Sequence, residues 1–263
     1  MFSGGKGANC AAAAARAGCQ VKFVGPHGSD AFGKMARDRL AQEGIDISDF
    51  IELPSSKTGA ALFFQERKTA TYAALASTSA NNQLSPALVR KVEPANRESD
   101  LVFTHFAISS SVLEEIYRIC DCHKKHLVVH AEPAQSPIHF SKSAYLVVAN
   151  GFEAPLLVGC DDLDSAIHEL HRLGVQNVII KQKNRSLTFS DGIKVRSQPI
   201  PSTPPIQDVG SLECLTAWAA IRTGDLANAV RLGAKAMAVS FSRHGALDSM
   251  PYPSEVDFGG PHE

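Results

Sequence analysis

Two kinds of apolar segment alternate along most of the chain. Short runs rich in β-branched residues, such as 101–106, 145–149 and 178–181, have the length of buried strands. Longer segments between them, such as 112–124, carry apolar residues at the three- and four-residue spacing of a helix. This alternation is typical of a mostly parallel sheet covered by helices on both faces. We therefore predict an α/β fold that forms one domain over residues 1–263.

The alternation of strand and helix patterns is interrupted between residues 57 and 80. Two apolar runs there flank a charged turn at 65–68, which predicts a β-hairpin. On either side of this segment, we predict a helix capped by Asp30 and a helix that starts after Ser85 with Pro86 at its first position. The chain closes with two predicted helices, 213–222 and 226–241.

Composition and charge narrow the class of protein. The 263 residues carry a net charge of −1 and are 44% hydrophobic, which fits a soluble globular chain with a full core. No basic surplus indicates a nucleic-acid partner, and no run of about 18 apolar residues is long enough to span a membrane. The six cysteines show no CxxC pair or disulfide-like spacing, and no charged-then-apolar leader precedes the first glycines. We therefore expect a cytoplasmic protein without nucleic-acid or membrane partners.

The start of the chain is rich in glycine. The segment Gly4-Gly5-Lys6-Gly7-Ala8-Asn9 leads directly into an alanine-rich helix predicted for residues 10–17. Glycines at this spacing let backbone N–H groups approach a polar ligand, and the positive end of the following helix points to the same place. The other interpretation is a flexible terminus that happens to contain glycines.

The pattern extends well beyond this segment. From Gly4 to Gly28 it reads Gly-Gly-x-Gly-x-Asn-x-Ala, six residues, Gly, nine residues, Gly. With this signature the chain resembles the ribokinase branch of the phosphofructokinase-B family of carbohydrate kinases. The resemblance implies a ribokinase-like fold whose hairpin belongs to a small, here incomplete, β lid over a sugar, and a lid-to-lid homodimer. It also implies a set of sugar-binding residues, namely Gly4, Gly5, Lys6 and Asn9.

The same resemblance implies transfer of the terminal phosphoryl group of ATP to a sugar hydroxyl, in the ribokinase branch the 5-hydroxyl of ribose. Asn150-Gly151-Phe152-Glu153, directly after the apolar run 145–149, matches the family's Asn-x-x-Glu element, which organises Mg²⁺ and its waters around the phosphates. A carboxylate suits Mg²⁺, because this ion prefers oxygen ligands and keeps several waters. From the residues alone, Asn150 and Glu153 could equally form a helix cap.

The catalytic segment departs from the family pattern. Relatives carry Gly-Ala-Gly-Asp at the start of a late helix, where backbone N–H groups hold the phosphoryl group and the aspartate takes the proton of the hydroxyl. This chain has Gly210-Ser211-Leu212-Glu213. We therefore expect Gly210, Ser211 and Leu212 to form a weakened anion hole and Glu213 to act as the base.

Two features of this segment predict slow catalysis. If the position of Leu212 requires a positive φ, leucine costs roughly 1–2 kcal/mol there and turns a side chain toward the phosphate. Glu213 is a methylene longer than aspartate, which misplaces its carboxylate. Alternatively, Glu213 is only an acid placed favourably at the positive end of a helix.

Further candidate ligands lie near the end of the chain. Residues 238–249 resemble the family's terminal Val-x-Arg-x-Gly-Ala-x-x-Ser segment, which implies that Ser249 could coordinate K⁺. Either Gln207 or Asp208 takes the place of an aspartate that relatives have beside this site. The histidine pairs His123/His126 and His168/His171 have helical spacing but no obvious third metal ligand, and we expect them on solvated helix faces.

Two functions from different classes remain open. The first is a ribokinase-type carbohydrate kinase with impaired turnover, which uses ATP and Mg²⁺ and, if Ser249 coordinates it, K⁺. The second is a pseudokinase that binds a nucleotide, a sugar or a protein partner without turnover. Relatives also place a strand with an Asn-x-Asp sugar-binding element before the glycines, whereas three residues precede Gly4. We therefore expect either a rearranged sheet or a sequence that is an incomplete product of its gene.

Overall fold

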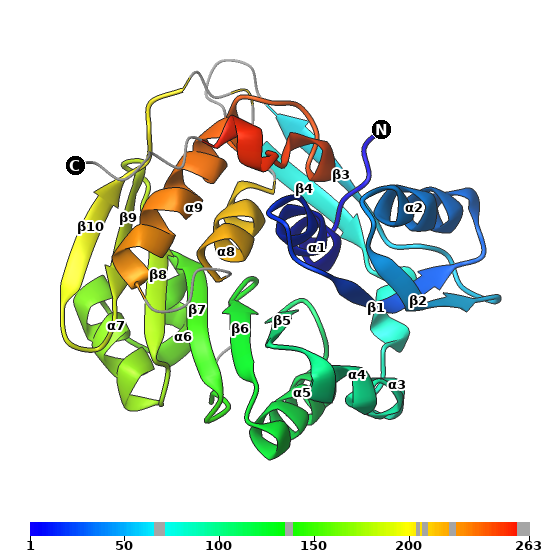
Figure 1. Cartoon of the computed structure of the whole chain (residues 1–263), viewed down its shortest axis with the longest axis horizontal. Coiled ribbons are helices and arrows are strands. Elements are labelled where there is room, and N and C mark those ends of the chain that lie inside the picture. Colours follow the sequence, from blue (N-terminus) through cyan, green and yellow to red (C-terminus); the bar gives the residue numbers. More distant parts are fainter. Residues whose placement is uncertain (66–71, 135–138, 204–205, 207–209, 221–224, 257–263) are drawn as a thin grey trace.

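A mostly parallel sheet forms the centre of the molecule (Figure 1). The computed structural model describes residues 1–65, 72–134, 139–203, 206, 210–220 and 225–256. The strands of this sheet are β5 (Leu101–His105), β6 (His126–His130), β7 (Ala144–Asn150), β8 (Asn177–Lys181), β9 (Ser186–Ser190) and β10 (Val195–Pro199). Within the described residues their order is β10-β9-β8-β7-β6-β5. β5 to β8 are parallel, and β9 and β10 extend the β8 edge in antiparallel fashion.

Helices cover both faces of this sheet, as predicted. One face carries α5 (Ser110–His123), α6 (Glu153–Val158) and α7 (Leu163–Arg172), and the other carries α8 (Ser211–Ala220) and α9 (Leu226–Phe241). Neighbouring residues of β7 point to opposite layers, because Val147 packs into the core below the first three helices and Val148 into the core below the other two. Both side chains are fully buried, which explains why this strand is a continuous apolar run.

A smaller sheet lies at the other side of the molecule. It consists of β1 (Lys22–Gly28) and β2 (Asp46–Leu53), which are parallel. Within the described residues β1 ends this sheet and β5 ends the larger one, and α1 (Lys6–Arg16) contacts both strands. The small side chains of α1 allow close packing against α8. The N-terminal helix therefore connects the two sheets.

Two helix caps are present in this half of the molecule, and the one at Asp30 was predicted. α2 (Ala31–Gln42) follows β1, and the N–H group of Gly33 donates to the side chain of Asp30. α3 (Pro86–Lys91) begins after Ser85, whose hydroxyl accepts from the N–H group of Leu88. The short elements are α4 (Glu93–Glu98), η1 (Ser79–Gln83), η2 (Leu247–Ser249) and η3 (Pro253–Glu255).

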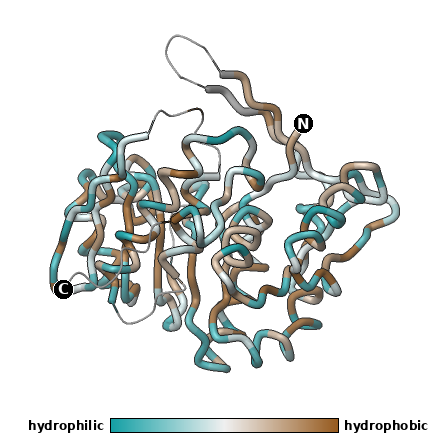
Figure 2. The backbone as a smooth tube through the Cα atoms, turned by 45° about the horizontal axis from the view of Figure 1, so that its top comes forward, coloured by the Kyte–Doolittle hydropathy of each residue, from teal (hydrophilic) through white to brown (hydrophobic). Residues whose placement is uncertain are grey.

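The predicted hairpin projects from the body of the molecule (Figure 2). β3 (Ala60–Gln65) and β4 (Tyr72–Ser77) pair in antiparallel fashion, with Leu62 opposite Leu75. Large apolar side chains on these strands are at least half exposed, namely Leu62, Phe63, Phe64 and Leu75. The hairpin therefore presents an apolar surface that the described part of the chain leaves exposed.

Some predicted boundaries and groupings are wrong. α1 begins at Lys6 rather than at residue 10, so Asn9 lies in the helix and not in a loop. His126 belongs to β6, so it does not share a helix with His123. No three His, Cys, Asp or Glu side chains of the described part of the chain are arranged to hold a metal ion. No helix among the described residues is long and apolar enough for a membrane span. The positions 207 and 208 lie outside the described residues.

Candidate functional site

Charged residues from distant parts of the chain meet at the carboxyl ends of the parallel strands, where open α/β sheets bind ligands. The starts of α1, α6 and α8 bring Lys6, Glu153 and Glu213 to this edge, and the segment after β6 adds Glu132. We call these four residues, with the supporting His130, the Lys6 cluster. Sequence analysis predicted Lys6, Glu153 and Glu213 as site residues, and the structure brings all three together.

Lys6 is the positive centre of this cluster. Its Nζ lies 2.9 Å from Glu132 Oε2 and 4.0 Å from Glu213 Oε1. Burial is the largest influence on the pKa of Lys6 and lowers it, but the negative charges of Glu213, Glu132 and Glu153 together raise that pKa above its usual value. The ammonium therefore stays charged at neutral pH.

Glu132 is held from two sides. Besides Lys6, its Oε2 atom accepts a hydrogen bond of 2.9 Å from Nε2 of His130, a side chain that is only 1% exposed. Burial would raise the pKa of Glu132, but the bonds from His130 and Lys6 outweigh it and lower that pKa to about 2. Nδ1 of His130 is buried without a partner in the described structure, so the ring interacts with Glu132 through Nε2, which donates its proton to the carboxylate. Glu132 is therefore a fixed, ionised carboxylate.

The neighbouring strand contributes a neutral imidazole. Burial, with help from the charges of His130 and Lys6, lowers the pKa of His105 to about 4. Nδ1 of His105 accepts from the N–H group of Ala107 at 3.1 Å, so the ring carries its proton on Nε2. That atom would lie 3.6 Å from a Cβ added to Gly7, which shows that the ring packs directly against the first turn of α1.

Asn9 occupies the buried side of the same turn. Its residue is 3% exposed, and its Oδ1 atom has no hydrogen-bond partner in the described structure. A Cβ added to Gly4 would lie 3.6 Å from this oxygen and 3.3 Å from the side chain of Ala246. Gly4 therefore passes close to a polar atom that has no partner among the described residues, and the next residue, Gly5, has a φ of 110°, a region that favours glycine.

The start of α8 differs from the prediction at Leu212. The residue with positive φ is Gly210, at 84°, while Ser211 and Leu212 have helical backbones. The Leu212 side chain is 5% exposed and packs into the core below α8 and α9. The predicted strain at Leu212 and its side chain toward the phosphate are therefore wrong. Glu213, 6% exposed in the first turn of the helix, directs its carboxylate toward Lys6.

Asn150 and Glu153 are joined at the end of β7. Nδ2 of Asn150 donates to Glu153 Oε2 at 3.1 Å, and the N–H group of Ala134 donates to Oε1 at 3.3 Å. Burial raises the pKa of Glu153, and the charge of Glu132 adds to this effect. The alternative of a helix cap is wrong, because α6 has Phe152 at its N-cap and no side-chain capping bond.

Ser249 lies fully buried beside the end of α9. Its hydroxyl donates to the carbonyl of Ala246 at 2.8 Å and is 2.7 Å from the hydroxyl of Ser240. A Cβ added to Gly210 would come within 3.2 Å of the same Ala246 carbonyl, so this segment abuts the start of α8. The role of Ser249 in K⁺ binding stays a prediction.

Sequence analysis missed Glu132, His130 and His105. None of them belongs to a recognised motif. The sequence nevertheless held a signal for the two histidines, because His105 and His130 are the last residues of two apolar strands. Ligands of open α/β sheets bind at the carboxyl ends of the parallel strands. The two residues are also direct neighbours in the strand register.

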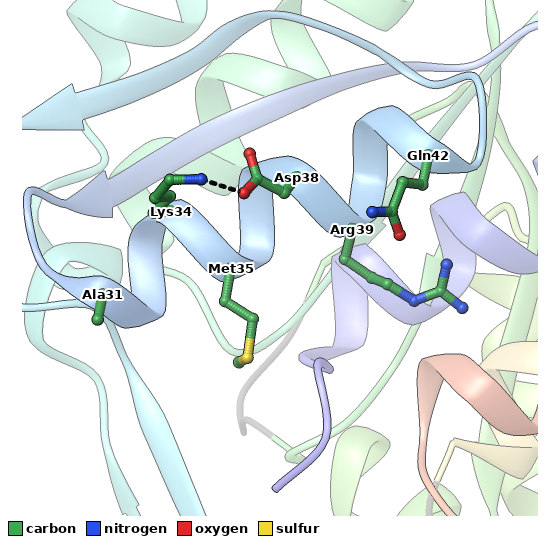
Figure 3. Close-up of a pocket in the computed structure, with 6 residues that line it drawn as sticks. All are labelled: Ala31, Lys34, Met35, Asp38, Arg39 and Gln42. Carbon is green, nitrogen blue, oxygen red and sulfur yellow. Dashed lines mark hydrogen bonds and ion pairs between the residues drawn. The ribbon is translucent and has the colours of Figure 1, made fainter.

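A shallow hollow of about 360 Å³ lies away from this cluster, over the outer side of α2 (Figure 3). Its lining comes from one helix, and Lys34 and Asp38 form an ion pair along it. The lining residues are Ala31, Lys34, Met35, Asp38, Arg39 and Gln42. Because none of them belongs to the Lys6 cluster, we assign no chemistry to this hollow.

Comparisons with known proteins agree with this geometry. A model of the pfkB family of carbohydrate kinases matches residues 1–253. Ribokinase of Haemophilus influenzae is 30% identical over 268 residues, covering 96% of this chain and 85% of that protein. Ribokinase of Bacillus subtilis is 27% identical over 262 residues, covering 97% and 86%.

Solved structures show the same fold. Arabidopsis thaliana ribokinase complexed with ribose and ATP matches with a TM-score of 0.86 at 21% identity, covering 97% of this chain and 86% of that one. Giardia lamblia ribokinase matches with a TM-score of 0.85 at 22% identity, covering 97% and 88%. On the family match and the sequence relatives together, the chain belongs to the pfkB family of carbohydrate kinases and is of the ribokinase type.

Proposed function

We propose that this protein transfers the terminal phosphoryl group of ATP to a hydroxyl of a sugar, with ribose as the preferred substrate. The observation that carries the proposal is the Lys6 cluster, in which an ammonium group lies 2.9 Å from Glu132 and 4.0 Å from Glu213. A hydrogen-bond donor for sugar oxygens therefore stands beside a carboxylate that can take a hydroxyl proton. Relatives named ribokinases, and the ribose and ATP in the Arabidopsis structure, support these substrates.

The start of α8 supplies the catalytic groups. Glu213 accepts the proton of the hydroxyl while the sugar oxygen bonds to phosphorus and the bond from phosphorus to the ADP oxygen breaks. The backbone N–H groups around Gly210, Ser211 and Leu212, with the positive end of the helix, stabilise the charge on the transferring group. Lys6, Asn9 and the glycines before them hold the sugar.

The residues at the end of β7 fit Mg²⁺ bound through water. Asn150 and Glu153 offer oxygen atoms at the edge of the sheet. Each Glu153 oxygen accepts one hydrogen bond from the described residues, which leaves acceptor capacity for metal-bound water. When bound with ATP, Mg²⁺ neutralises phosphate charge. We also propose that Ser249 and the carbonyl of Ala246 lie in a K⁺ site.

We propose slow turnover, because the base is a methylene longer than the aspartate of relatives. The test compares wild type, Glu213→Gln and Glu213→Asp in ATP-dependent ribose phosphorylation. The control is Glu169→Gln on α7, where the Glu169 side chain is 24% exposed and pairs with Arg172 outside the Lys6 cluster. Glu213→Gln should lower kcat at least about 100-fold, since general-base catalysis is worth that much. Glu213→Asp should raise kcat, and Glu169→Gln should leave it unchanged.

The outcomes separate the two functions. Wild type that binds ATP with Mg²⁺ in calorimetry but forms no sugar phosphate would be the pseudokinase. Wild type that binds neither nucleotide nor sugar would overturn the kinase proposal. Equal kcat values for wild type and Glu213→Gln would remove Glu213 from the role of base.

We also propose a homodimer through the exposed hairpin, whose apolar side chains a second copy would cover. We propose a cytoplasmic location as well, since the six cysteines form no disulfide bond in the structure.

A further inference from the structure

We propose that Glu132 is a substrate-binding residue that, together with Lys6, recognises two neighbouring hydroxyls of the sugar. This inference rests on the proposed kinase function and names the part of the substrate that the cluster reads. Glu132 follows β6, belongs to no sequence motif discussed above, and has a side chain that is 28% exposed.

Glu132 is fixed in place before any sugar arrives. Its Oε2 atom accepts hydrogen bonds from His130 Nε2 and Lys6 Nζ, both at 2.9 Å. His130 is almost completely buried at the end of β6, so the carboxylate is anchored to the central sheet. A binding group that is held in place loses little conformational entropy when a ligand arrives.

Glu132 retains hydrogen-bonding capacity for a ligand. Both bonds to Glu132 go to Oε2, and Oε1 makes no hydrogen bond with the part of the chain that the structure describes. A carboxylate oxygen can accept two hydrogen bonds, and an ammonium group can donate three. Glu132 Oε1 can therefore accept from two hydroxyls, while Lys6 donates to a hydroxyl oxygen. A pair of neighbouring hydroxyls supplies these donors and acceptors.

Glu132 also lies close to the other groups proposed to act on the sugar. Lys6 bridges Glu132 and Glu213, with its Nζ 4.0 Å from the carboxylate proposed as the base. Asn9 lies on the same helical turn as Lys6, and its buried Oδ1 atom has no hydrogen-bond partner in the described structure. This oxygen is therefore a second polar group that can bind a ligand. A sugar held by Glu132 and Lys6 would therefore lie beside both Asn9 and Glu213.

The experiment measures sugar binding without nucleotide. The affinities of wild type, Glu132→Gln, Glu132→Asp and the control Glu169→Gln for ribose and 2-deoxyribose are determined by calorimetry, with melting curves to confirm folding. Glu132→Gln should weaken ribose binding about 10- to 100-fold, the range for losing hydrogen bonds to a charged group. It should also remove most of the preference of wild type for ribose over 2-deoxyribose, because the deoxy sugar lacks one of the paired hydroxyls. Glu132→Asp should retain part of that preference.

Other results would contradict the assignment. If Glu132→Gln weakens both sugars by the same factor, or binds ribose as wild type does, Glu132 does not read the hydroxyl pair. If Glu132→Gln binds ribose normally but loses affinity for ATP with Mg²⁺, Glu132 contributes to binding of the nucleotide and its metal ion instead of the sugar. Wild type that binds ribose but does not phosphorylate it would leave this assignment standing and overturn only the kinase function.

Discussion

Asp30 joins two segments of the N-terminal half through one carboxylate. Its Oδ1 atom accepts from Gly33 N–H at 2.9 Å and from the Thr58 hydroxyl at 2.6 Å, and its Oδ2 atom accepts from Thr58 N–H at 3.0 Å. The bonds from Thr58 and then Gly33 lower the pKa of Asp30 to about 2. The residue thereby links the start of α2 to the entry of the hairpin.

The lowered pKa predicts a pH-dependent contribution to stability. Because the pKa of Asp30 falls on folding from about 3.8 to about 2, its stabilising effect is present above pH 4 and is lost as the pH falls to 2. Asp30→Asn should therefore be less stable than wild type at pH 7, and the difference should disappear between pH 4 and pH 2. Urea unfolding midpoints across this range measure it. A deficit that is the same at pH 7 and at pH 2 would show that the charge of Asp30 contributes nothing.

At Leu212 the sequence pointed to the wrong residue. The family pattern has a glycine at this position, which suggested that its backbone needs a positive φ. In the structure the residue with positive φ in this turn is Gly210. Leu212 has a helical backbone and a buried side chain, so Leu212→Gly should destabilise the core instead of opening the anion hole. A sequence pattern shows which residue is unusual, but the direction of its side chain depends on where the helix starts.

Two glycines connect the end of β1, the start of α2 and the segment before the hairpin. A Cβ added to Gly28 would lie 2.5 Å from the carbonyl of Ser56, and a Cβ added to Gly33 would lie 2.1 Å from the carbonyl of Gly28. Both contacts are with backbone atoms, which cannot move aside as a side chain can. These positions therefore require the absence of a side chain.

Alanine at these glycines should destabilise the protein selectively. Gly28→Ala and Gly33→Ala should each lower the free energy of unfolding by roughly 3 kcal/mol or more, the upper range for overpacking. Gly25→Ala is the matched control in the same strand, because its added Cβ would meet only the Phe23 ring at an ordinary 3.6 Å, so its effect should stay below about 1 kcal/mol. Chemical denaturation of the three variants provides the measurement. Equal stabilities of Gly25→Ala and Gly28→Ala would refute the close approach at Gly28.

Elements with local signals could be predicted well from the sequence. α9 spans the predicted residues 226–241, because Asp225 caps it and its apolar residues have helical spacing. The start of α1 could not be predicted, since glycine disfavours helix by about 1 kcal/mol and Gly5 and Gly7 suggested a loop. Gly7 is helical because the first turn packs against Phe23 and His105, a tertiary contact that the local sequence does not reveal.

The candidate site shows the same limit at the scale of the whole molecule. Lys6, Glu153 and Glu213 could be found because each lies in a recognisable motif. Glu132 joins them only because β6 pairs with β5 and α1 packs across the edge of the sheet. This arrangement places Lys6 Nζ 2.9 Å from Glu132 Oε2. Contacts between residues so far apart in the sequence follow from the order of strands and helices in the fold. The local sequence showed only that Glu132 is a polar residue after an apolar strand.

The exposed hairpin predicts the oligomeric state. Leu62, Phe64 and Leu75 lie on one face of β3–β4, because Leu62 and Leu75 are register partners and Phe64 is two residues further along the strand. They are 59%, 62% and 67% exposed, which is unusual for a group of large apolar side chains on one surface. A second copy of the chain, bringing the same face, would remove this surface from water. We therefore expect wild type to be a dimer in sedimentation equilibrium at micromolar concentration.

The hairpin variant Leu62→Lys/Phe64→Lys should shift this equilibrium to the monomer, since two charges per copy would have to be buried in the interface. Its matched control is Ile193→Lys, a substitution of an 86% exposed apolar residue in the turn between β9 and β10, which should leave the dimer intact. Both variants should melt in one cooperative transition close to that of wild type, because the substituted side chains are exposed in a single chain. A monomeric wild type, or a hairpin variant that remains a dimer, would place any self-association elsewhere on the surface.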